Sequence, residues 1–267
     1  MSQSLPDIAF FHELATLASQ ETLPRFRSLS ANQIETKLKE GFRFDPVTEA
    51  DREAERVIRE HITRYYPDHA IMGEEFGLSG EGPVRWVLDP VDGTRPFLCG
   101  LPVWGTLIGL LHHERAVMGM MSQPFTGECF WADGSQAWRS DRDGKMRLST
   151  RKGVSLEQAI LHTTAPEALS MHPAVRFADL TESTLMTRYG GECYAMAMLA
   201  TGQIDICVEF GLQPYDIVAL IPIIEQAGGI ITDLNGQRAE AGGTVVATGS
   251  PDLHQQVLDI LNGTRSA

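Results

Sequence analysis

Asp89 and Asp92 close an apolar run that begins at Val84, in the stretch VRWVLDPVDGTRPF. Aspartate, proline and glycine are typical of turns, so a structural turn is enough to explain the local pattern. Carboxylates are also the hard oxygen ligands that Mg²⁺ prefers. Pro90 stiffens the stretch, and Gly93 allows the following backbone to approach an anion closely. The stretch is interpreted either as a turn or as part of a site for metal and phosphate.

Three further acidic positions occur where a strand or loop is expected to meet a helix. They are Asp51 in DPVTEAD, the pair Glu74 and Glu75 in MGEEFG, and Asp216 in LQPYDIVALIPIIEQAGG. Each has a structural alternative: a capping box between Thr48 and Asp51, a solvated loop, and a dipole-favoured acid in a first helical turn. Taken with the two aspartates above, these acids fit a site for two or more Mg²⁺ ions. Such ions activate water and stabilise the departing oxygen in phosphoester hydrolysis.

Other phosphate and metal motifs do not occur in the sequence. It contains no EF-hand loop, no GxxxxGK[ST] P-loop, no HExxH and no GxSxG with plausible partners. The eight histidines show no ligand spacing. Four cysteines form no CxxC pair, which predicts buried free thiols rather than a zinc site or disulfides: Cys99, Cys129, Cys193 and Cys207.

Composition restricts the class of partner and the location. The formal charge of −13 predicts repulsion of nucleic acid and anionic lipid, so neither is expected as a partner. No apolar stretch approaches the roughly 18 residues of a membrane span. The start of the chain, MSQSLPDIAFFHE, lacks the basic and apolar regions of a secretory signal. A cytoplasmic protein is therefore expected.

The elements expected in the first part of the chain are two helices followed by hairpins. Apolar spacing predicts amphipathic helices over residues 7–27 and from about 48 to 67, with a polar, irregular stretch, ETKLKEGFRFDP, between them. Short strands follow up to about residue 148 and predict an antiparallel sheet. Residues 1–148 are thus expected to form an α+β half that holds most of the candidate ligands.

Strands alternate with helices over residues 149–267, which predicts an α/β half with a mostly parallel, covered sheet. The helices expected in this half lie near residues 173–180, 191–200, 214–226 and from 251 onward. At 267 residues the chain is long for a single domain. The two halves are expected to form one catalytic unit of the mixed α/β (α+β) class.

Four acidic motifs, DPVTEAD, GEE, DPVDGT and PYD, occur in an order and spacing that closely resemble the inositol monophosphatase family. This family consists of Mg²⁺-dependent, lithium-sensitive phosphatases, and the resemblance extends over nearly the whole chain. It implies a layered αβαβα sandwich and a homodimer. It also implies two to three Mg²⁺ ions, with Mn²⁺ as a substitute and Li⁺ as an inhibitor.

The resemblance assigns metal ligands by position. It implies Glu74, Asp89 and the carbonyl of Val91 for a first ion, Asp89, Asp92 and Asp216 for a second, and Asp51, through water, for a weaker third.

The resemblance also assigns catalytic and phosphate-binding groups. Glu74 and Thr94 would orient and deprotonate the attacking water, and Asp92 completes the catalytic set. The amides of Gly93 and Thr94 would hold the phosphate, with Asp216 at the substrate. The first stretch is then a turn for metal and phosphate, and not merely a turn.

Three longer stretches resemble the histidinol-phosphatase branch of the family: DGTRPFLCGLPVWGTLIGLL, RYGGECYAMAMLATGQIDICVE and LQPYDIVALIPIIEQAGG. Inositol enzymes usually carry Thr-Asn-Phe after DGT and Trp-Asp at the last motif, whereas this chain has Arg95-Pro96-Phe97 and Tyr215-Asp216. Histidinol phosphate is therefore the expected substrate. The alternatives are an inositol monophosphatase or promiscuous sugar-phosphate phosphatase, a nucleotide 3′-phosphatase, and a non-catalytic Mg²⁺-dependent phospholigand-binding protein.

Two more acids are candidates for recognition of a cationic substrate. Glu192 opens a helix after the RYGG turn, and Glu209 ends the strand IDICVE. Both lie at or just after the carboxyl end of an expected strand, where open α/β sheets usually bind ligands. Arg95 and Arg188 are expected to flank the same site and to pair with these acids. The structural alternative for Glu192 is an acid favoured by the helix dipole.

Overall fold

The computed structural model describes residues 5–28, 34–37 and 45–264 of the chain. Its first sheet and the surrounding elements are α1 (Ile8–Thr22), β1 (Ile34–Lys37), β2 (Asp45–Thr48), α2 (Glu49–Tyr65), β3 (Ala70–Gly73), β4 (Gly77–Ser79), β5 (Val84–Asp92), α3 (Thr94–Cys99), β6 (Gly105–His112), β7 (Arg115–Gln123), β8 (Glu128–Ala132), β9 (Ala137–Asp141) and β10 (Gly144–Arg147). The second sheet and its helices comprise β11 (Ile160–Thr163), α4 (Phe177–Ser183), β12 (Met186–Tyr189), α5 (Glu192–Ala200), β13 (Ile206–Leu212), α6 (Pro214–Ile217), α7 (Leu220–Gln226), β14 (Ile230–Asp233), β15 (Gly243–Thr248) and α8 (Pro251–Leu261).

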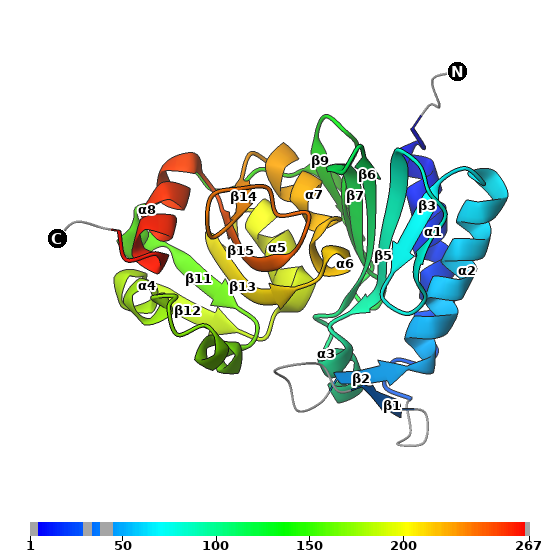
Figure 1. Ribbon diagram of the computed structural model, residues 1–267, viewed down its shortest axis with the longest axis horizontal. Helices are drawn as coiled ribbons and strands as arrows, with labels where there is room; N and C mark the ends of the chain where they lie inside the picture. Colours follow the sequence, from blue (N-terminus) through cyan, green and yellow to red (C-terminus); the bar gives the residue numbers. More distant parts are fainter. Residues whose placement is uncertain (1–4, 29–33, 38–44, 265–267) are drawn as a thin grey trace.

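These elements stack in five layers, which confirms the predicted αβαβα sandwich. Figure 1 shows α1 and α2 at one side, then the larger sheet, the helices α5, α6 and α7, the smaller sheet, and finally α4 and α8. Sheets with helices on both faces need apolar side chains on both faces of each strand. In β6, for example, Leu107 packs towards the central helices, whereas Ile108 packs towards α1 and α2.

The larger sheet has the strand order β10-β9-β8-β7-β6-β5-β3-β4. Neighbouring strands are antiparallel apart from β3 and β5, which are parallel. The helix α2 covers one face with side chains spaced by three or four residues, among them Ala54, Ile58 and Ile62. The acidic side chains Asp51 and Glu55 fall on this same buried stripe, which is unusual for charged groups.

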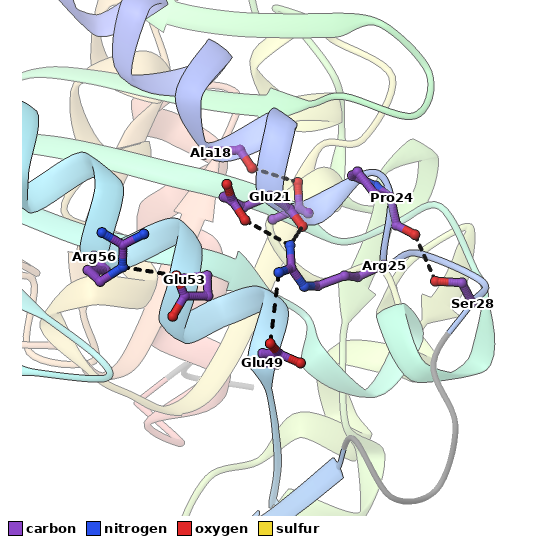
Figure 2. A network of polar contacts seen from close by, with 9 residues as sticks. Ala18, Glu21, Pro24, Arg25, Ser28, Glu49, Glu53 and Arg56 are labelled. Carbon is purple, nitrogen blue, oxygen red and sulfur yellow. Dashed lines mark hydrogen bonds and ion pairs between the residues drawn. The ribbon is translucent and has the colours of Figure 1, made fainter.

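Arg25, in the turn that follows α1, contacts both α1 and α2 (Figure 2). Its guanidinium donates to the Glu21 carboxylate at 2.8 Å and lies 4.0 Å from the carboxylate of Glu49, the first residue of α2. This contact links the end of α1 to the start of the helix that carries Asp51. Thr48, the predicted partner of Asp51 in a capping box, has a side chain outside the described residues.

The smaller sheet is mixed, so the prediction of a mostly parallel sheet holds for four of its strands but not for β15. Its order is β12-β11-β13-β15-β14. The pairs of β11 with β12 and with β13 are parallel, but β15 runs antiparallel to both β13 and β14. The reason is the short connection from β14 to β15, residues 234–242, which contains no crossover helix and so allows only antiparallel pairing.

Two other predicted elements differ from those observed. The single helix expected over 214–226 is divided into α6 and α7, because Pro222 has no N–H to donate to the Val218 carbonyl and its ring would clash there. The stretch expected to be irregular contains the antiparallel pair β1 and β2, while its central residues 38–44 lie outside the described part. Within the described residues, no helix is both long and apolar enough to cross a bilayer.

Candidate active site

A β-bulge at the end of β5 brings Asp89 and Asp92 together. Asp89 pairs with Leu107 and Asp92 with Gly105, so three residue steps on β5 oppose two on β6. In a regular strand, residues three apart point to opposite faces of the sheet, and one additional residue reverses this relation. The positive φ of 84° belongs to Gly93, after the strand has ended. The predicted turn is therefore a bulged strand followed by a glycine turn.

Hydrogen bonds fix this bulge. The Val91 N–H donates to Asp89 Oδ1 at 3.1 Å, and the Thr106 hydroxyl donates to the Pro90 carbonyl at 2.8 Å. The Thr94 hydroxyl donates to the Val91 carbonyl at 3.3 Å. The lone pairs of the Thr94 hydroxyl remain as acceptors on the side of the cavity described below.

Carboxylates from four elements converge on this bulge in two overlapping groups. Ligand atoms of Asp51, Glu74 and Asp89 lie within 4.8 Å of one another, and so do those of Asp89, Asp92 and Asp216. Asp89 is common to both groups. The structure thus brings together all five predicted carboxylate ligands, and Val91 lies in the bulge between Asp89 and Asp92.

Asp216 reaches the group through an unusually close helix–sheet contact. It is the third residue of α6, where its carboxylate accepts from the Gln213 N–H at 2.7 Å in a capping box. Just beyond it, the backbone at Val218 and Ala219 rests on the paired glycines Gly109 and Gly119 of β6 and β7. A Cβ at Gly119 would overlap with the Ala219 carbonyl, so only glycine permits this approach. The helix break at Pro222 and the glycine pair together place Asp216 against β5.

Burial and neighbouring negative charges raise the pKa values of three acids at the site, Asp89, Asp92 and Glu192. The pKa of Asp89 is raised well above its usual value by burial and by the charges of Glu74 and Asp92. Burial also raises the pKa of Asp92 to about 6, although its hydrogen bond from Cys193 acts in the opposite direction. Glu192, on the neighbouring helix α5, has its pKa raised to about 8 by burial and by the charges of Asp92 and Glu209. Bound cations would relieve this cost.

These shifts predict that the metal-free protein loses stability as the pH rises. A carboxylate whose pKa is raised in the folded state stabilises the fold below its unfolded pKa, and this contribution is lost as the pH passes through the folded value. With folded values of about 6 for Asp92 and about 8 for Glu192, the melting temperature in chelator should fall between about pH 5 and about pH 8.5. Excess Mg²⁺ should restore it at the alkaline end. A melting temperature that is independent of pH in chelator would contradict this prediction.

The acids open onto a cavity of about 440 Å³ between the two sheets. Its lining includes Glu74, Asp89, Asp92, Thr94, Arg95, Glu192, Glu209 and Asp216. Asp51 is buried and is not among the lining residues. Arg188 is exposed on β12 and does not line the cavity either, because β12 is the edge strand of its sheet. Arg95 lies 3.9 Å from the exposed Glu167 carboxylate.

Two other acids of the cavity, Glu209 and Glu192, are hydrogen-bonded to Thr164, a residue that was not predicted from the sequence. Its N–H donates to both carboxylate oxygens of Glu209, at 2.9 and 3.0 Å, and its hydroxyl donates to one of them at 3.1 Å. The same hydroxyl accepts from the Glu192 N–H at 3.1 Å. Thr164 follows the parallel strand β11, so the rule used for Glu209 would have indicated it too.

Glu192 and Glu209 each have an unusual backbone setting. Glu209 lies within β13 and not at its end, because a second bulge between Glu209 and Leu212 extends the strand. Glu192 begins α5 with a φ of 48°, in the left-handed region that favours glycine. Such conformations persist at sites where the surrounding structure imposes them. Here Gly93 packs against Glu192, whose Cγ would lie 2.9 Å from a Cβ at Gly93.

Comparison with known proteins agrees with this geometry. A sequence model of the inositol monophosphatase family matches residues 6–264. A histidinol-phosphatase from Streptomyces coelicolor is 35% identical over 270 residues, covering 98% of this chain and 99% of that protein. The chloroplastic bifunctional phosphatase IMPL2 of Arabidopsis thaliana is 41% identical over 228 residues, which are 81% of this chain but 65% of the plant protein.

The fold also matches a solved structure. An inositol monophosphatase from Zymomonas mobilis superimposes with a TM-score of 0.83 and 33% identity, over 95% of this chain and 96% of the other. The match of the family model over nearly the whole length, the shared layers and the convergent carboxylates lead to one assignment. The chain belongs to the inositol monophosphatase family.

Proposed function

We propose that the protein is a Mg²⁺-dependent phosphomonoesterase that hydrolyses L-histidinol phosphate to L-histidinol and phosphate, in histidine biosynthesis. The choice of this substrate is supported by acids in the cavity beyond those proposed to bind metal. Glu192 and Glu209 lie there in addition to the carboxylates grouped around Asp89. Histidinol phosphate carries an ammonium group and an imidazole, and such a substrate would be attracted by acids that are not needed for metal binding.

The residues around the β5 bulge fit divalent cations. All donors are oxygens, the two groups share Asp89, and the pKa values of Asp89 and Asp92 are raised as expected for crowded, buried carboxylates. We assign Glu74, Asp89 and the Val91 carbonyl to one ion and Asp89, Asp92 and Asp216 to another, with Asp51 at a third. The chemistry supplied by such ions is the stabilisation of charge on phosphoryl oxygens and the acidification of water.

The protein's own side chains and backbone amides would position the water, accept its proton and bind the phosphate. The Thr94 hydroxyl donates to the Val91 carbonyl, which leaves its oxygen free to accept a hydrogen bond from the attacking water. Glu74 would take the proton of that water as its oxygen bonds to phosphorus. The amides of Gly93 and Thr94 would hold the phosphoryl oxygens at the start of α3. The bond between phosphorus and the ester oxygen would then break, the leaving alkoxide would take up a proton from water, and Glu74 would return its proton to the solvent.

Glu192 and Glu209 would recognise the part of the substrate beyond the phosphate. Thr164 hydrogen-bonds to the Glu209 carboxylate and to the backbone N–H of Glu192, as described above. Arg95 also lines the cavity and lowers the pKa of Glu192 by its charge, against the larger effect of burial. Arg188 lies on the edge strand β12 and does not line the cavity, so we assign it no role in substrate binding. The whole-length similarity to a histidinol-phosphatase supports this substrate.

An inositol phosphate or another sugar phosphate is the second candidate. The Zymomonas mobilis protein of the same fold is an inositol monophosphatase, and Glu209 could accept hydrogen bonds from sugar hydroxyls as well as from a cation. A nucleotide 3′-phosphatase has no specific observation in its favour. A non-catalytic phospholigand-binding protein would not need the Thr94 hydroxyl beside the metal acids.

Three further features belong to this proposal. We expect a homodimer in solution, which size-exclusion chromatography with light scattering would test. Free cysteines, two of them buried, suit a reducing compartment such as the cytoplasm. We also expect Mn²⁺ to replace Mg²⁺ and Li⁺ to inhibit.

Phosphate release across a substrate panel tests the proposal. We expect histidinol phosphate to be hydrolysed with a higher kcat/KM than inositol 1-phosphate, fructose 1,6-bisphosphate or adenosine 3′,5′-bisphosphate when Mg²⁺ is present. Chelation with EDTA should abolish the release of phosphate, and excess Mg²⁺ should restore it, because the acids alone would repel the phosphate group. Full activity in stringent chelator would contradict the proposed chemistry.

A further inference from the structure

The helix α2 carries a second acid one turn beyond Asp51. Glu55 is completely buried, yet it is not a member of either group of candidate metal ligands. Its carboxylate accepts from the N–H of Glu75 at 2.8 Å and from the N–H of Phe76 at 3.2 Å. It also accepts from Arg59 Nε at 2.6 Å, so its charge is paired within the helix. Both amide donors belong to the tight turn between β3 and β4 that contains Glu74.

Three other features hold this turn against α2. Gly73, immediately before Glu74, has no Cβ, and a Cβ there would overlap with the Glu55 carboxylate. Arg59 donates to the Ser79 hydroxyl at 2.9 Å and to the Gly77 carbonyl on the far side of the turn. The guanidinium groups of Arg52 and Arg59 lie over the Phe76 ring, at 5.7 and 5.9 Å.

We propose that Glu55 is a positioning residue, which orients the Glu74 carboxylate for metal binding by clamping the backbone of its turn. Residues four apart lie on one face of a helix. The same face of α2 therefore delivers Asp51 to the metal ligands and Glu55 to the turn that carries a neighbouring ligand. This inference rests on the proposed function, in which Glu74 is a metal ligand.

The chemistry of Glu55 points to positioning rather than to packing. Apart from the candidate metal ligand Asp51, the other side chains of this buried stripe are apolar, and an apolar residue at position 55 would fill the same space without the cost of burying a charge. A carboxylate is useful here because it accepts several hydrogen bonds in fixed directions. Groups that orient metal ligands in this way typically change metal affinity or activity by about 10- to 100-fold when they are removed.

Glu55→Gln tests the proposal with a matched control on the same helix. Glutamine keeps the size of the side chain but replaces one carboxylate oxygen with an NH₂ group, which donates hydrogen bonds. This NH₂ group would then face an N–H donor of the turn or of Arg59. Calorimetric titration of the full-length, metal-free variant with Mn²⁺ alone should show about 10- to 100-fold weaker binding. With saturating metal, KM for the phosphoester should change little. Glu60→Gln makes the same change at an exposed position paired with Arg56, and should bind Mn²⁺ as the unchanged protein does.

Gly73→Ala is a second route to the same effect, in case Glu55→Gln does not fold. It displaces the Glu55 carboxylate without altering any charge, and should weaken Mn²⁺ binding similarly. If either variant is folded and binds Mn²⁺ with unchanged affinity, Glu55 is a structural residue and the inference is wrong. If the unchanged protein binds no Mn²⁺ and hydrolyses no phosphoester, the proposed function itself has failed, which is a distinguishable result.

Discussion

Asp89→Asn is expected to lower kcat for phosphomonoester hydrolysis by about 10³-fold or more. Asp89 is the acid shared by both groups of candidate metal ligands, so the change removes charge from both at once. Metal ions supply several kcal/mol of transition-state stabilisation, and each 1.36 kcal/mol corresponds to about tenfold in rate. Initial rates at saturating Mg²⁺ and substrate measure the effect, and Asp92→Asn should behave similarly.

The stability of the same variant should move in the opposite direction. The Asp89 carboxyl is buried, and its pKa is raised well above the usual value, so the charged form is unfavourable without metal. Asparagine has no charge to bury, and the metal-free variant should melt at an equal or higher temperature than the unchanged protein at about pH 8. A wild-type rate for Asp89→Asn would refute the metal assignment. A low rate with a low melting temperature would indicate misfolding instead.

Two companion variants separate the roles of neighbouring groups. Thr94→Ala should leave Mn²⁺ binding largely intact while lowering kcat, because it removes only the positioning of the nucleophile.

For Asp51→Asn, a capping role predicts a stability loss of about 1 kcal/mol with an unchanged rate. A third-metal role predicts a lower rate and a higher Mg²⁺ requirement.

Glu192→Gln is expected to raise KM for histidinol phosphate strongly while barely affecting a generic aryl phosphate, because bound cations lower the pKa of Glu192 from about 8 and so keep it charged in the complex. Removal of one partner from a desolvated charge pair costs about 2–5 kcal/mol, which corresponds to roughly 30- to 5,000-fold in affinity. Glu192 is the sharper test, because Glu209 also holds the N–H and hydroxyl of Thr164. Glu209→Gln should therefore combine a KM effect with some loss of stability.

Glu167→Gln is the matched control, since it removes an exposed acid near Arg95. Its kinetics should be unchanged on both substrates. Equal losses on both substrates for Glu192→Gln would indicate a structural role, such as an acid at the start of α5. A preference of the unchanged protein for inositol 1-phosphate would overturn the substrate and leave the phosphatase chemistry in place.

The sequence alone indicated the candidate residues for the proposed chemistry. Asp89, Asp92, Glu74, Asp51 and Asp216 could be named because their motifs are local: each lies at a strand end or helix start whose signals fall within a few neighbouring residues. Apolar spacing likewise predicted α1 and α2, because periodicity depends on which side of an element is buried, and short apolar runs predicted β5 and β6. The resemblance to the inositol monophosphatase family over nearly the whole chain then implied the order of the layers.

Only the tertiary structure decided how these residues meet. The bulge in β5 depends on its pairing with β6, and the single extra residue that aligns Asp89 with Asp92 cannot be read from one strand. The approach of Asp216 needs glycines on two other strands beneath the break before Pro222. The antiparallel direction of β15 followed from a short connection that the alternating pattern concealed.

The roles of Glu55 and Thr164 could not be predicted from the sequence for the same reason. Glu55 reads in sequence as one more acid on an amphipathic helix, and Thr164 as the end of a strand. Their roles arise from hydrogen bonds to residues 20 and 45 positions away, respectively. Local sequence signals fix which groups are available because propensity and periodicity act over short distances. Long-range packing fixes which of them touch, because direction, register and close approach are properties of two elements together.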